Sequence, residues 1–396
     1  MGEWLEKRMD EIADFNPRES IQKGAIAKKV AMDKLQPFCR DVPGFEMEAF
    51  SGGTKFRNGD TIMARITPCL ENGKTAKVDI LDEDEVGFGS TEYIVYRAKE
   101  GNDPDFLYYL VTSPVVREPA IKSMVGSSGR QRVQTDVVQG LKVRIPDLSG
   151  QQAIAGVLKI LDDKIAANRR VNDNLTEQAR SIFQSWFIDY EPFGSSMPPD
   201  WQPATLGQIA VIKTDSWSPA KNPDVVVEHY SIPSYDEQRY PVFESASGIK
   251  SNKYLLTSDS VMISKLNPDT KRIWRPLCLS GHPVCSTEFI VYEAKKKGQR
   301  DYIYSLIDSV PFFNHLCSHT TGSTNSRQRA TPKSTLDFAL YLPPDSVIED
   351  FCQIVTPIYD LIASNIVENQ SLAKTRDNLL PRLMSGELDV SKVDDL

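Results

Sequence analysis

SGQQAIAGVLKILDDKIAANRRVNDNLTEQARSIFQSWFIDY, residues 149–190, is the stretch that decides the fold. Positions suited to contact with another helix, called the seam below, recur along it at alternating steps of four and three, a mean period of 3.5 residues. This period predicts a long helix that packs lengthwise against another helix. Ser149 followed by Gln152 is a capping-box pair, so we expect the helix to begin there. The predicted seam is Ile154, Leu158, Leu161, Ile165, Asn168, Asn172 and Leu175, continuing to Ala179, Ile182 and Trp186.

The same pattern returns 197 residues later, after a second capping pair, Ser346 and Glu349. Asn168 and Asn172 of the first stretch correspond to Asn365 and Asn369 of the second. A buried Asn fixes the register of a helix pair because only a matching polar group satisfies its hydrogen bonds. We therefore expect the partner helix in the same chain. If the two helices lie antiparallel, which the family resemblance given below implies, each domain would stand at an opposite end of one rod. Pro357 should kink this second helix or remove one hydrogen bond. Its predicted seam is Phe351, Val355, Ile358, Ile362, Asn365, Asn369 and Leu372, continuing to Arg376, Leu379 and Leu383, with Arg376 standing where the first helix has Ala179.

The sequence around the helices repeats as well. STEYIVYRA (90–98) returns as STEFIVYEA (286–294), and GSSGRQRVQTD (126–136) returns as GSTNSRQRATPKS (322–334). β-branched and aromatic residues predict strands at 61–66 and 92–96, and helices follow Pro104 and Pro114. The chain is thus predicted to be an α+β protein with a pseudo-twofold internal repeat. Two α/β domains (1–148 and 201–345) alternate with the helices (149–190 and 346–390), and 191–200 is a Pro/Gly/Ser-rich linker.

Composition narrows the class of protein. At 396 residues the chain is long enough for two to four domains. It holds no run of eighteen apolar residues and begins without an apolar signal segment, which excludes a membrane span and a secretory leader. Six scattered cysteines without a CxxC pair suit free thiols in a reducing compartment, so we expect a cytoplasmic protein. A net charge of −8 argues mildly against nucleic acid contacting the whole surface, but a local basic face is compatible with it.

No motif for catalysis is present, and we predict no catalytic residue in this chain. The sequence has no phosphate-binding GxxxxGK[ST] loop, no GxSxG elbow and no HExxH pair. His315 and His319 are four residues apart, but no further ligand is evident, so we predict no metal site. Asp162 and Asp163 lie beside the seam and are interpreted as a solvated face.

Basic residues carry the clearest chemical signal. Arg130, Gln131 and Arg132 follow a Gly/Ser loop, and Arg327, Gln328 and Arg329 repeat them. Arg can pair with guanine and Gln with adenine in the major groove, whereas the same groups also suit phosphate contact or a structural turn. Because both copies retain the triplet, structural positioning and DNA contact stay open as alternatives. A second basic set, interleaved with Tyr254 and Trp274, contains Lys253, Lys265, Lys271, Arg272 and Arg275.

At the helices the chain resembles a known family. GVLKILDDKIAANRRVNDNLTEQARSIFQSWFIDYEPF (156–193) resembles the central spacer of the specificity subunit of type I restriction-modification systems. NQSLAKTRDNLLPRLMSGELDV (369–390) resembles the C-terminal spacer of that family. The order of domain, spacer, domain and spacer also matches, so the resemblance covers nearly the whole chain.

The resemblance implies a non-catalytic DNA-recognition subunit. Each domain would be a target recognition domain that binds one half of a bipartite site in double-stranded DNA. The paired helices would set the gap between the halves and dock two adenine methyltransferase subunits, which use S-adenosylmethionine. Motor-nuclease subunits would add cleavage driven by ATP with magnesium, so no cofactor is expected in this chain.

A second hypothesis is a scaffold whose two domains hold other proteins. It predicts little salt-sensitive DNA binding and no sequence preference, whereas a specificity subunit should bind a gapped asymmetric site with affinity that falls steeply in salt.

Overall fold

The computed structural model describes residues 4–321 and 328–390. These residues form two compact units. Unit 1 contains residues 1–167 and 368–396, and unit 2 contains residues 168–367. Each of the two 40-residue helices, α5 (Leu148–Phe187) and α11 (Asp345–Met384), therefore contributes one half to each unit. No helix in the described ranges is long and apolar enough to cross a membrane.

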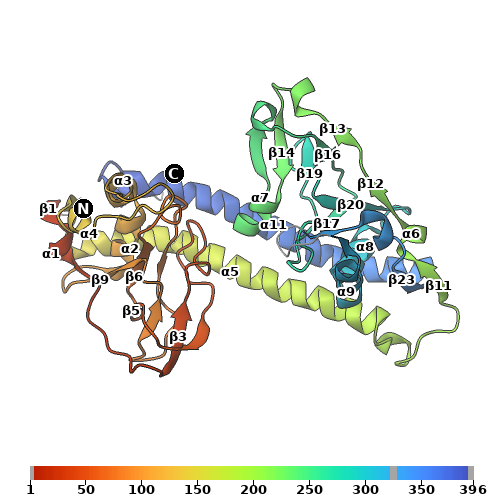
Figure 1. Ribbon diagram of the computed structural model, residues 1–396, viewed down its shortest axis with the longest axis horizontal. Helices are drawn as coiled ribbons and strands as arrows, with labels where there is room; N and C mark the ends of the chain where they lie inside the picture. Colours follow the sequence, from red (N-terminus) through yellow and green to blue (C-terminus); the bar gives the residue numbers. More distant parts are fainter. Residues whose placement is uncertain (1–3, 322–327, 391–396) are drawn as a thin grey trace. The chain divides into compact units, whose positions relative to one another are not determined.

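Unit 1 is built on two four-stranded sheets, with orders β2-β9-β6-β7 and β4-β3-β8-β5, and a short pair, β1-β10. All pairings are antiparallel except β3 with β8. Helix α2 packs on β6 and β9 (Figure 1). The strands are β1 (Leu5–Arg8), β2 (Ala13–Phe15), β3 (Ile26–Val30), β4 (Glu46–Ala49), β5 (Thr54–Phe56), β6 (Thr61–Ala64), β7 (Thr75–Lys77), β8 (Gly87–Gly89), β9 (Tyr93–Ala98) and β10 (Lys142–Ile145), and the short helices are α1 (Met9–Ile12), α2 (Pro104–Thr112), α3 (Pro114–Lys122) and α4 (Thr135–Gln139).

Unit 2 repeats this plan. Its sheets have the orders β12-β20-β17-β18 and β13-β16-β19-β14-β15, with a short pair β11-β23, and β14 with β19 is again the parallel pairing. Helix α7 (Ile232–Gln238) and a two-stranded ribbon, β21-β22, extend the plan. The strands are β11 (Gln202–Thr205), β12 (Ala210–Lys213), β13 (Ser216–Trp217), β14 (Val226–Tyr230), β15 (Val242–Ser245), β16 (Lys253–Leu255), β17 (Ser260–Ser264), β18 (Ile273–Trp274), β19 (Pro283–Ser286), β20 (Phe289–Ala294), β21 (Thr320–Thr321), β22 (Arg329–Ala330) and β23 (Ala339–Leu342); the other helices are α6 (Leu206–Ile209), α8 (Arg300–Asp308), α9 (Val310–Ser318) and α10 (Pro332–Thr335), with 3-10 turns η1 (Glu191–Phe193), η2 (Pro219–Lys221) and η3 (Ala246–Gly248).

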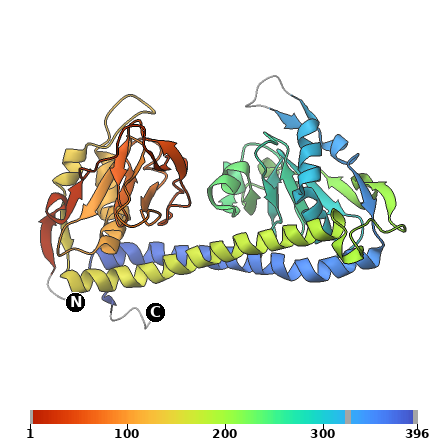
Figure 2. The same cartoon turned by 90° about the horizontal axis from the view of Figure 1, so that it is seen from below.

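The two long helices pair antiparallel within each unit. In unit 1 the beginning of α5 lies beside the end of α11 (Figure 2), and Lys164 forms an ion pair with Glu368 at 3.3 Å. In unit 2 the amide of Asn365 donates to Asn172 Oδ1 at 2.8 Å. The predicted helix pair is thus confirmed. Every predicted seam residue is buried or half-buried, from Ile154 (0% exposed) and Phe351 (0%) to Asn365 (9%).

Each domain is anchored on its half of the helix pair by a continuous apolar core. In unit 1, Ile154 and Leu158 of α5 and Leu379 and Leu383 of α11 join the core beneath α2. In unit 2 the core is rich in aromatic rings, and Phe183 and Phe187 of α5 contact Phe351 of α11 at centroid distances of 5.9 and 4.9 Å. Seam residues of the two long helices are therefore also part of the hydrophobic core of each domain.

Three details of the helices differ from expectation. Both predicted caps are wrong, because α5 begins at Leu148 and α11 at Asp345, which places Ser149 and Ser346 inside the first turns. For α5 the capping acceptor is Asp147, whose Oδ1 accepts the Gly150 N–H at 2.9 Å. The helix assignment runs unbroken through Pro357, whose side chain lies on the exposed face. Because proline has no N–H, the helix lacks one backbone hydrogen bond there, which is the second of the two effects expected of it.

Asp162 is the third departure from expectation. It is not part of a solvated face, because it is only 5% exposed. Its Oδ1 accepts from Arg376 Nη1 at 2.6 Å, and its Oδ2 accepts from the Tyr109 hydroxyl at 2.7 Å. A pattern of charges along one helix does not reveal a cation that arrives from a helix more than two hundred residues later.

Candidate nucleic-acid interface

The repeated STE and RQR motifs meet at one corner of unit 1. Arg132 donates from Nε and Nη2 to the two carboxylate oxygens of Glu92, at distances of 2.7–3.0 Å. Around this ion pair, Arg65 N–H donates to Glu92 O and Val133 N–H donates to Arg65 O. Hydrogen bonding to Arg132 holds the pKa of Glu92 below its ordinary value, and Glu92 raises the pKa of Arg132. The third residue of the triplet is therefore bound to its own domain.

Unit 2 reproduces the arrangement of this corner. Arg329 donates from Nε and Nη2 to Glu288 at 2.9 and 3.2 Å. Lys265 N–H donates to Glu288 O, and Ala330 N–H donates to Lys265 O. The backbone contact of the middle residue is also repeated, since Thr67 N–H donates to Gln131 O and Asn267 N–H donates to Gln328 O. Structural positioning thus accounts for Arg132 and Arg329, and for why both copies retain the motif.

The loop that precedes the corner in unit 1 is a turn exposed to solvent. Gly126 and Gly129 have φ of +138° and +77°, and a Cβ on Gly126 would lie 2.8 Å from the Arg130 carbonyl oxygen, so glycine is required there. Arg130 is exposed and Gln131 half-buried. Neither side chain has a hydrogen bond or ion pair with the residues that the structure describes. The first two residues of the triplet are therefore available to a ligand. Arg327 lies outside the described residues, and Gln328 is half-buried.

Two residues of the second basic set do not fit a DNA contact. Lys253 is only 5% exposed, and its Nζ donates to the carbonyl and hydroxyl oxygens of Ser251. Burial lowers its pKa. Arg275 is held between Asp301 (2.8 Å) and Asp360 (2.6 Å), where it ties β18 to α8 and α11. The burial of Lys253 and the two ion pairs of Arg275 argue against the predicted contact of these residues with DNA, and counting charges along a sequence does not reveal burial.

The remaining members of the set differ in how firmly they are engaged. Lys271 pairs with the buried Asp308 at 2.5 Å, and Arg272 forms a two-pronged ion pair with Asp236, with Nε and Nη2 at 2.6 and 2.9 Å. Lys265 is half-buried at the RQR corner, and no side-chain bond to another described residue ties it down. Among the residues that the structure describes, the candidates without a side-chain hydrogen bond or ion pair are therefore Arg130, Gln131, Lys265 and Gln328.

Sequence reasoning missed the carboxylates that organise each domain. Asp301 at the start of α8 is 2% exposed and binds Arg275, Arg300 and the Thr356 hydroxyl of α11. In unit 1, Asp105 at the start of α2 holds Lys77 of β7 and Lys159 of α5. An Asp in the first turn of a helix was the only signal in the sequence, and that signal is shared by ordinary exposed helices.

The two neighbouring histidines have partners in the backbone. His315 Nε2 lies 2.9 Å from the Ser334 carbonyl oxygen, and His319 Nδ1 lies 2.9 Å from the His315 carbonyl oxygen. Within residues 4–321 and 328–390, no group of three or more His, Cys, Asp or Glu side chains could hold a metal ion.

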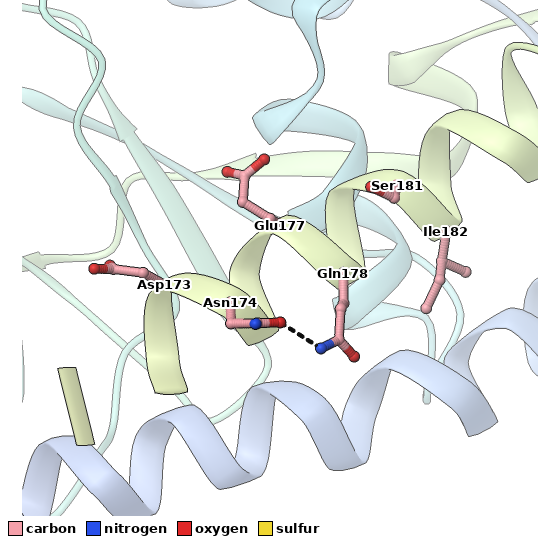
Figure 3. A pocket seen from close by; sticks show the side chains of 6 residues that line it. All are labelled: Asp173, Asn174, Glu177, Gln178, Ser181 and Ile182. Carbon is pink, nitrogen blue, oxygen red and sulfur yellow. Dashed lines mark hydrogen bonds between the residues drawn. The ribbon is translucent and has the colours of Figure 1, made fainter. Parts of the chain in front are cut away.

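A surface hollow lies on the outer face of α5 in unit 2. It is lined by Asp173, Asn174, Glu177, Gln178, Ser181 and Ile182, all from this helix (Figure 3). Gln178 donates to Asn174 at 2.5 Å across it. Two carboxylates and two amides make this face unsuited to phosphate, so it suits a protein or solvent better than DNA.

Comparison with known proteins bears on the whole chain. Residues 1–177 match the family described as the type I restriction modification DNA specificity domain. The MjaIX type I restriction enzyme specificity subunit of Methanocaldococcus jannaschii is 25% identical over 319 residues, which is 74% of this chain and 71% of the relative. The HindI specificity subunit of Haemophilus influenzae is 22% identical over an alignment covering 98% of this chain and 100% of the relative. The chain is a relative of type I restriction-modification specificity subunits.

The fold is shared with a solved specificity subunit. The crystal structure of the type I restriction-modification S subunit from M. genitalium aligns with a TM-score of 0.54 over 96% of both chains, at 15% identity. This likeness confirms the α+β fold predicted from the sequence, and the family match together with the two relatives confirms the family resemblance. The relatives are named as specificity subunits, and those names indicate no catalytic activity.

Proposed function

We propose that this chain is the DNA-specificity subunit of a type I restriction-modification complex, with one target recognition domain in each unit. Each domain reads one half of a bipartite site in double-stranded DNA. The observation that supports this most directly is the duplication of one domain plan in which the Arg132–Glu92 pair recurs as Arg329–Glu288, while most of the remaining sequence of the two domains differs. A common anchor with different surroundings is the arrangement expected of two readers of different DNA words.

Within each domain we assign base or phosphate contact to the loop residues that the domain leaves unengaged. In unit 1 these are Arg130 and Gln131, and in unit 2 they are Lys265 and Gln328. Arg and Gln carry the donor and acceptor groups that read guanine and adenine edges. Arg132 and Arg329 position the loops from behind through Glu92 and Glu288.

The paired helices supply spacing and docking in this proposal. They set the gap between the half-sites and bind two adenine methyltransferase subunits, for which the polar α5 face of Figure 3 offers amide and carboxylate groups. Motor-nuclease subunits complete the complex. S-adenosylmethionine, ATP and magnesium belong to those partner subunits, and the assembly works in the cytoplasm.

A binding experiment with matched variants tests the assignment. The chain is purified with its methyltransferase partner, and its affinity for the site found by methylome sequencing is measured between 50 and 200 mM salt, about the range over which phosphate contacts lose most affinity. R130A/Q131A should weaken binding about tenfold or more and relax specificity in one half-site only. The control is K142A, which removes an exposed cation of unit 1 that pairs with Glu6 on the short β1-β10 pair. Unchanged affinity and specificity in R130A/Q131A would exclude this loop as the reader, and salt-insensitive binding would favour the protein scaffold.

A further inference from the structure

The internal repeat creates a problem of partner choice for the long helices. Because α5 and α11 carry the same seam pattern 197 residues apart, each helix resembles its own partner. An α5 from one chain could then pair antiparallel with the α5 of a second copy, and α11 with a second α11. Nothing in the periodic pattern alone prevents this, since both arrangements match apolar positions with apolar positions.

Most cross-helix contacts would survive such self-pairing. In unit 2, Asn172 of α5 lies opposite Asn365 of α11, and in a pair of α5 helices it would meet Asn168 of the other copy. Phe183, which contacts Phe351, would meet Ile154. In a pair of α11 helices, Asn365 would meet Asn369, and Phe351 would meet Leu380. Amide thus meets amide, and apolar side chain meets apolar side chain.

One buried charged contact would not survive, and the exposed ion pair of Lys164 and Glu368 would be lost with it. The buried ion pair of Asp162 and Arg376 joins α5 to α11 within unit 1. The repeat places Ala179 at the position equivalent to Arg376, and Tyr359 at the position equivalent to Asp162. In a pair of α5 helices, each Asp162 would face Ala179 and lack its cation. In a pair of α11 helices, each Arg376 would face Tyr359 and keep only the partly exposed Asp377 of its own helix as a carboxylate partner. A pair of α5 helices would therefore bury two carboxylates without a cation, and a pair of α11 helices would lose the buried partner of two guanidinium groups, which is unfavourable in both cases.

The surroundings of the pair are adjusted to the same distinction. In unit 1 the Tyr109 hydroxyl of α2 donates to Asp162, whereas in unit 2 the equivalent α8 residue, Ser305, bonds the Tyr359 hydroxyl at 2.8 Å. The tyrosine at this contact is on the domain helix in unit 1 (Tyr109) and on the long helix in unit 2 (Tyr359). Unit 2 has the small Ala179 at the position where unit 1 has Arg376. Asp162 and Arg376 are 5% and 8% exposed, so solvent does little to relieve an unpaired charge at either position.

We propose that the Asp162–Arg376 pair selects pairing of α5 with α11 and excludes self-pairing between two copies of this chain. A polar group in a helix seam is known to specify partner and register in this way. The remaining seam supplies stability without distinguishing the partners. This inference stands on the helix contacts and does not depend on DNA binding.

The test uses the full chain, cut after purification. A protease site is introduced at the exposed Ser195–Ser196 in the linker, and the cut protein is unfolded in urea and refolded by dilution. The two pieces differ in mass, so native mass spectrometry separates mixed pairs from self-pairs. For the unaltered protein, mixed pairs should outnumber self-pairs at least tenfold. A separate sample is held at the highest urea concentration that preserves helicity, so that exchange without full unfolding gives the same comparison.

Charge-neutral variants provide the decisive contrast. D162N/R376Q removes both charges and leaves a polar side chain at each position, and the share of mixed pairs should fall toward one half, the value for random pairing. D162Y/R376A, which copies Tyr359 and Ala179 into unit 1, should give the same fall and serves if the first variant refolds poorly. The matched control is K164A/E368A, an exposed cross-helix ion pair, whose removal should leave the tenfold preference intact. Random pairing of the unaltered protein, or a preserved preference in both neutral variants, would overturn the proposal.

Discussion

The two units solve the same packing problem with different chemistry. In both, an Asp in the first turn of a domain helix holds a cation from a strand and a side chain from a long helix. Unit 1 uses Asp105 with Lys77 and Lys159, and unit 2 uses Asp301 with Arg275 and Thr356. At the seam, however, unit 1 has a buried ion pair where unit 2 has Tyr359 and Ala179. The shared fold determines where polar groups lie in each unit. The residues that occupy those positions determine how much stability is lost when one of the polar groups is removed.

The largest expected effect is on the unit 1 seam. R376A leaves Asp162 buried without its cation and should destabilise unit 1 by about 3 kcal/mol or more. Although burial alone would lower the pKa of Arg376, the neighbouring Asp162 and Asp377 raise it, which is the mark of a charged pair. The matched change in unit 2, Y359F, removes one hydroxyl bond and should cost about 1 kcal/mol.

Urea unfolding followed by hydrogen exchange in each unit measures both values. The double apolar variant D162L/R376M should recover most of the stability lost in R376A, because replacing both partners of a buried pair is close to neutral. Equal effects of R376A and Y359F would contradict the asymmetry described here.

The next effect separates the two Asp anchors. D301N should destabilise unit 2 by about 3 kcal/mol, because Asp301 is buried among Arg275 and Arg300, whereas D105N should cost unit 1 about 1 kcal/mol at its partly exposed site. Burial alone would raise the pKa of Asp301, but the two arginines hold it below its ordinary value. A lowered pKa means that the stabilisation is present above about pH 4 and is lost as the pH falls through the folded value.

Acid titration of the unfolding free energy checks the sign. The loss of unit 2 stability, which begins near pH 5 as protonation of the unfolded state sets in, should be shallower in D301N than in the unaltered chain. A steeper loss in D301N, or the same loss in both, would show that Asp301 does not titrate as a paired carboxylate.

The smallest effect concerns the feature that the units share. E92Q and E288Q each release the Arg of one RQR corner, and because these ion pairs are partly exposed the global stability should barely change. Local amide exchange should rise at Val125 and Arg132 in one variant and at Thr321 and Arg329 in the other, by similar factors, since the backbone ladder is the same in both corners. A response in only one unit would mean that the corners are not equivalent.

The sequence predicted what depends on local period and on repetition. The spacing of Ile154, Leu158 and their successors predicted the helix pair, and the matching Asn positions indicated a partner helix in the same chain. The antiparallel arrangement followed from the family resemblance. The non-equivalence of Arg376 and Ala179 was also visible as a break in the repeat, although its partner was not. Repeated STE and RQR motifs pointed to one site in each domain.

The remainder depends on contacts between residues distant in the chain. Asp162 and Arg376 are 214 positions apart, and the pairing of Arg132 with Glu92 joins residues 40 positions apart, so neither can be read from a local pattern. From the sequence, Lys253 was predicted to be an exposed cation that contacts DNA. Its burial results from packing within the β-sheet and not from residues next to it in the sequence, so the sequence did not reveal it. The start of α5 was predicted too late because its capping residue, Asp147, lies two residues before Ser149 and outside the periodic stretch.

The central claim is that each unit reads its own DNA half-site, and methylome sequencing tests it most directly. The chain is expressed with its methyltransferase partner, and residues 1–148 or 201–345 are replaced by the corresponding domain of a related specificity subunit. We expect a split adenine motif that disappears without this chain, and of which one half-word changes with each replacement while the other half-word and the gap remain. A methylome that is unchanged without the chain, or one in which a single replacement alters both half-words, would contradict the account.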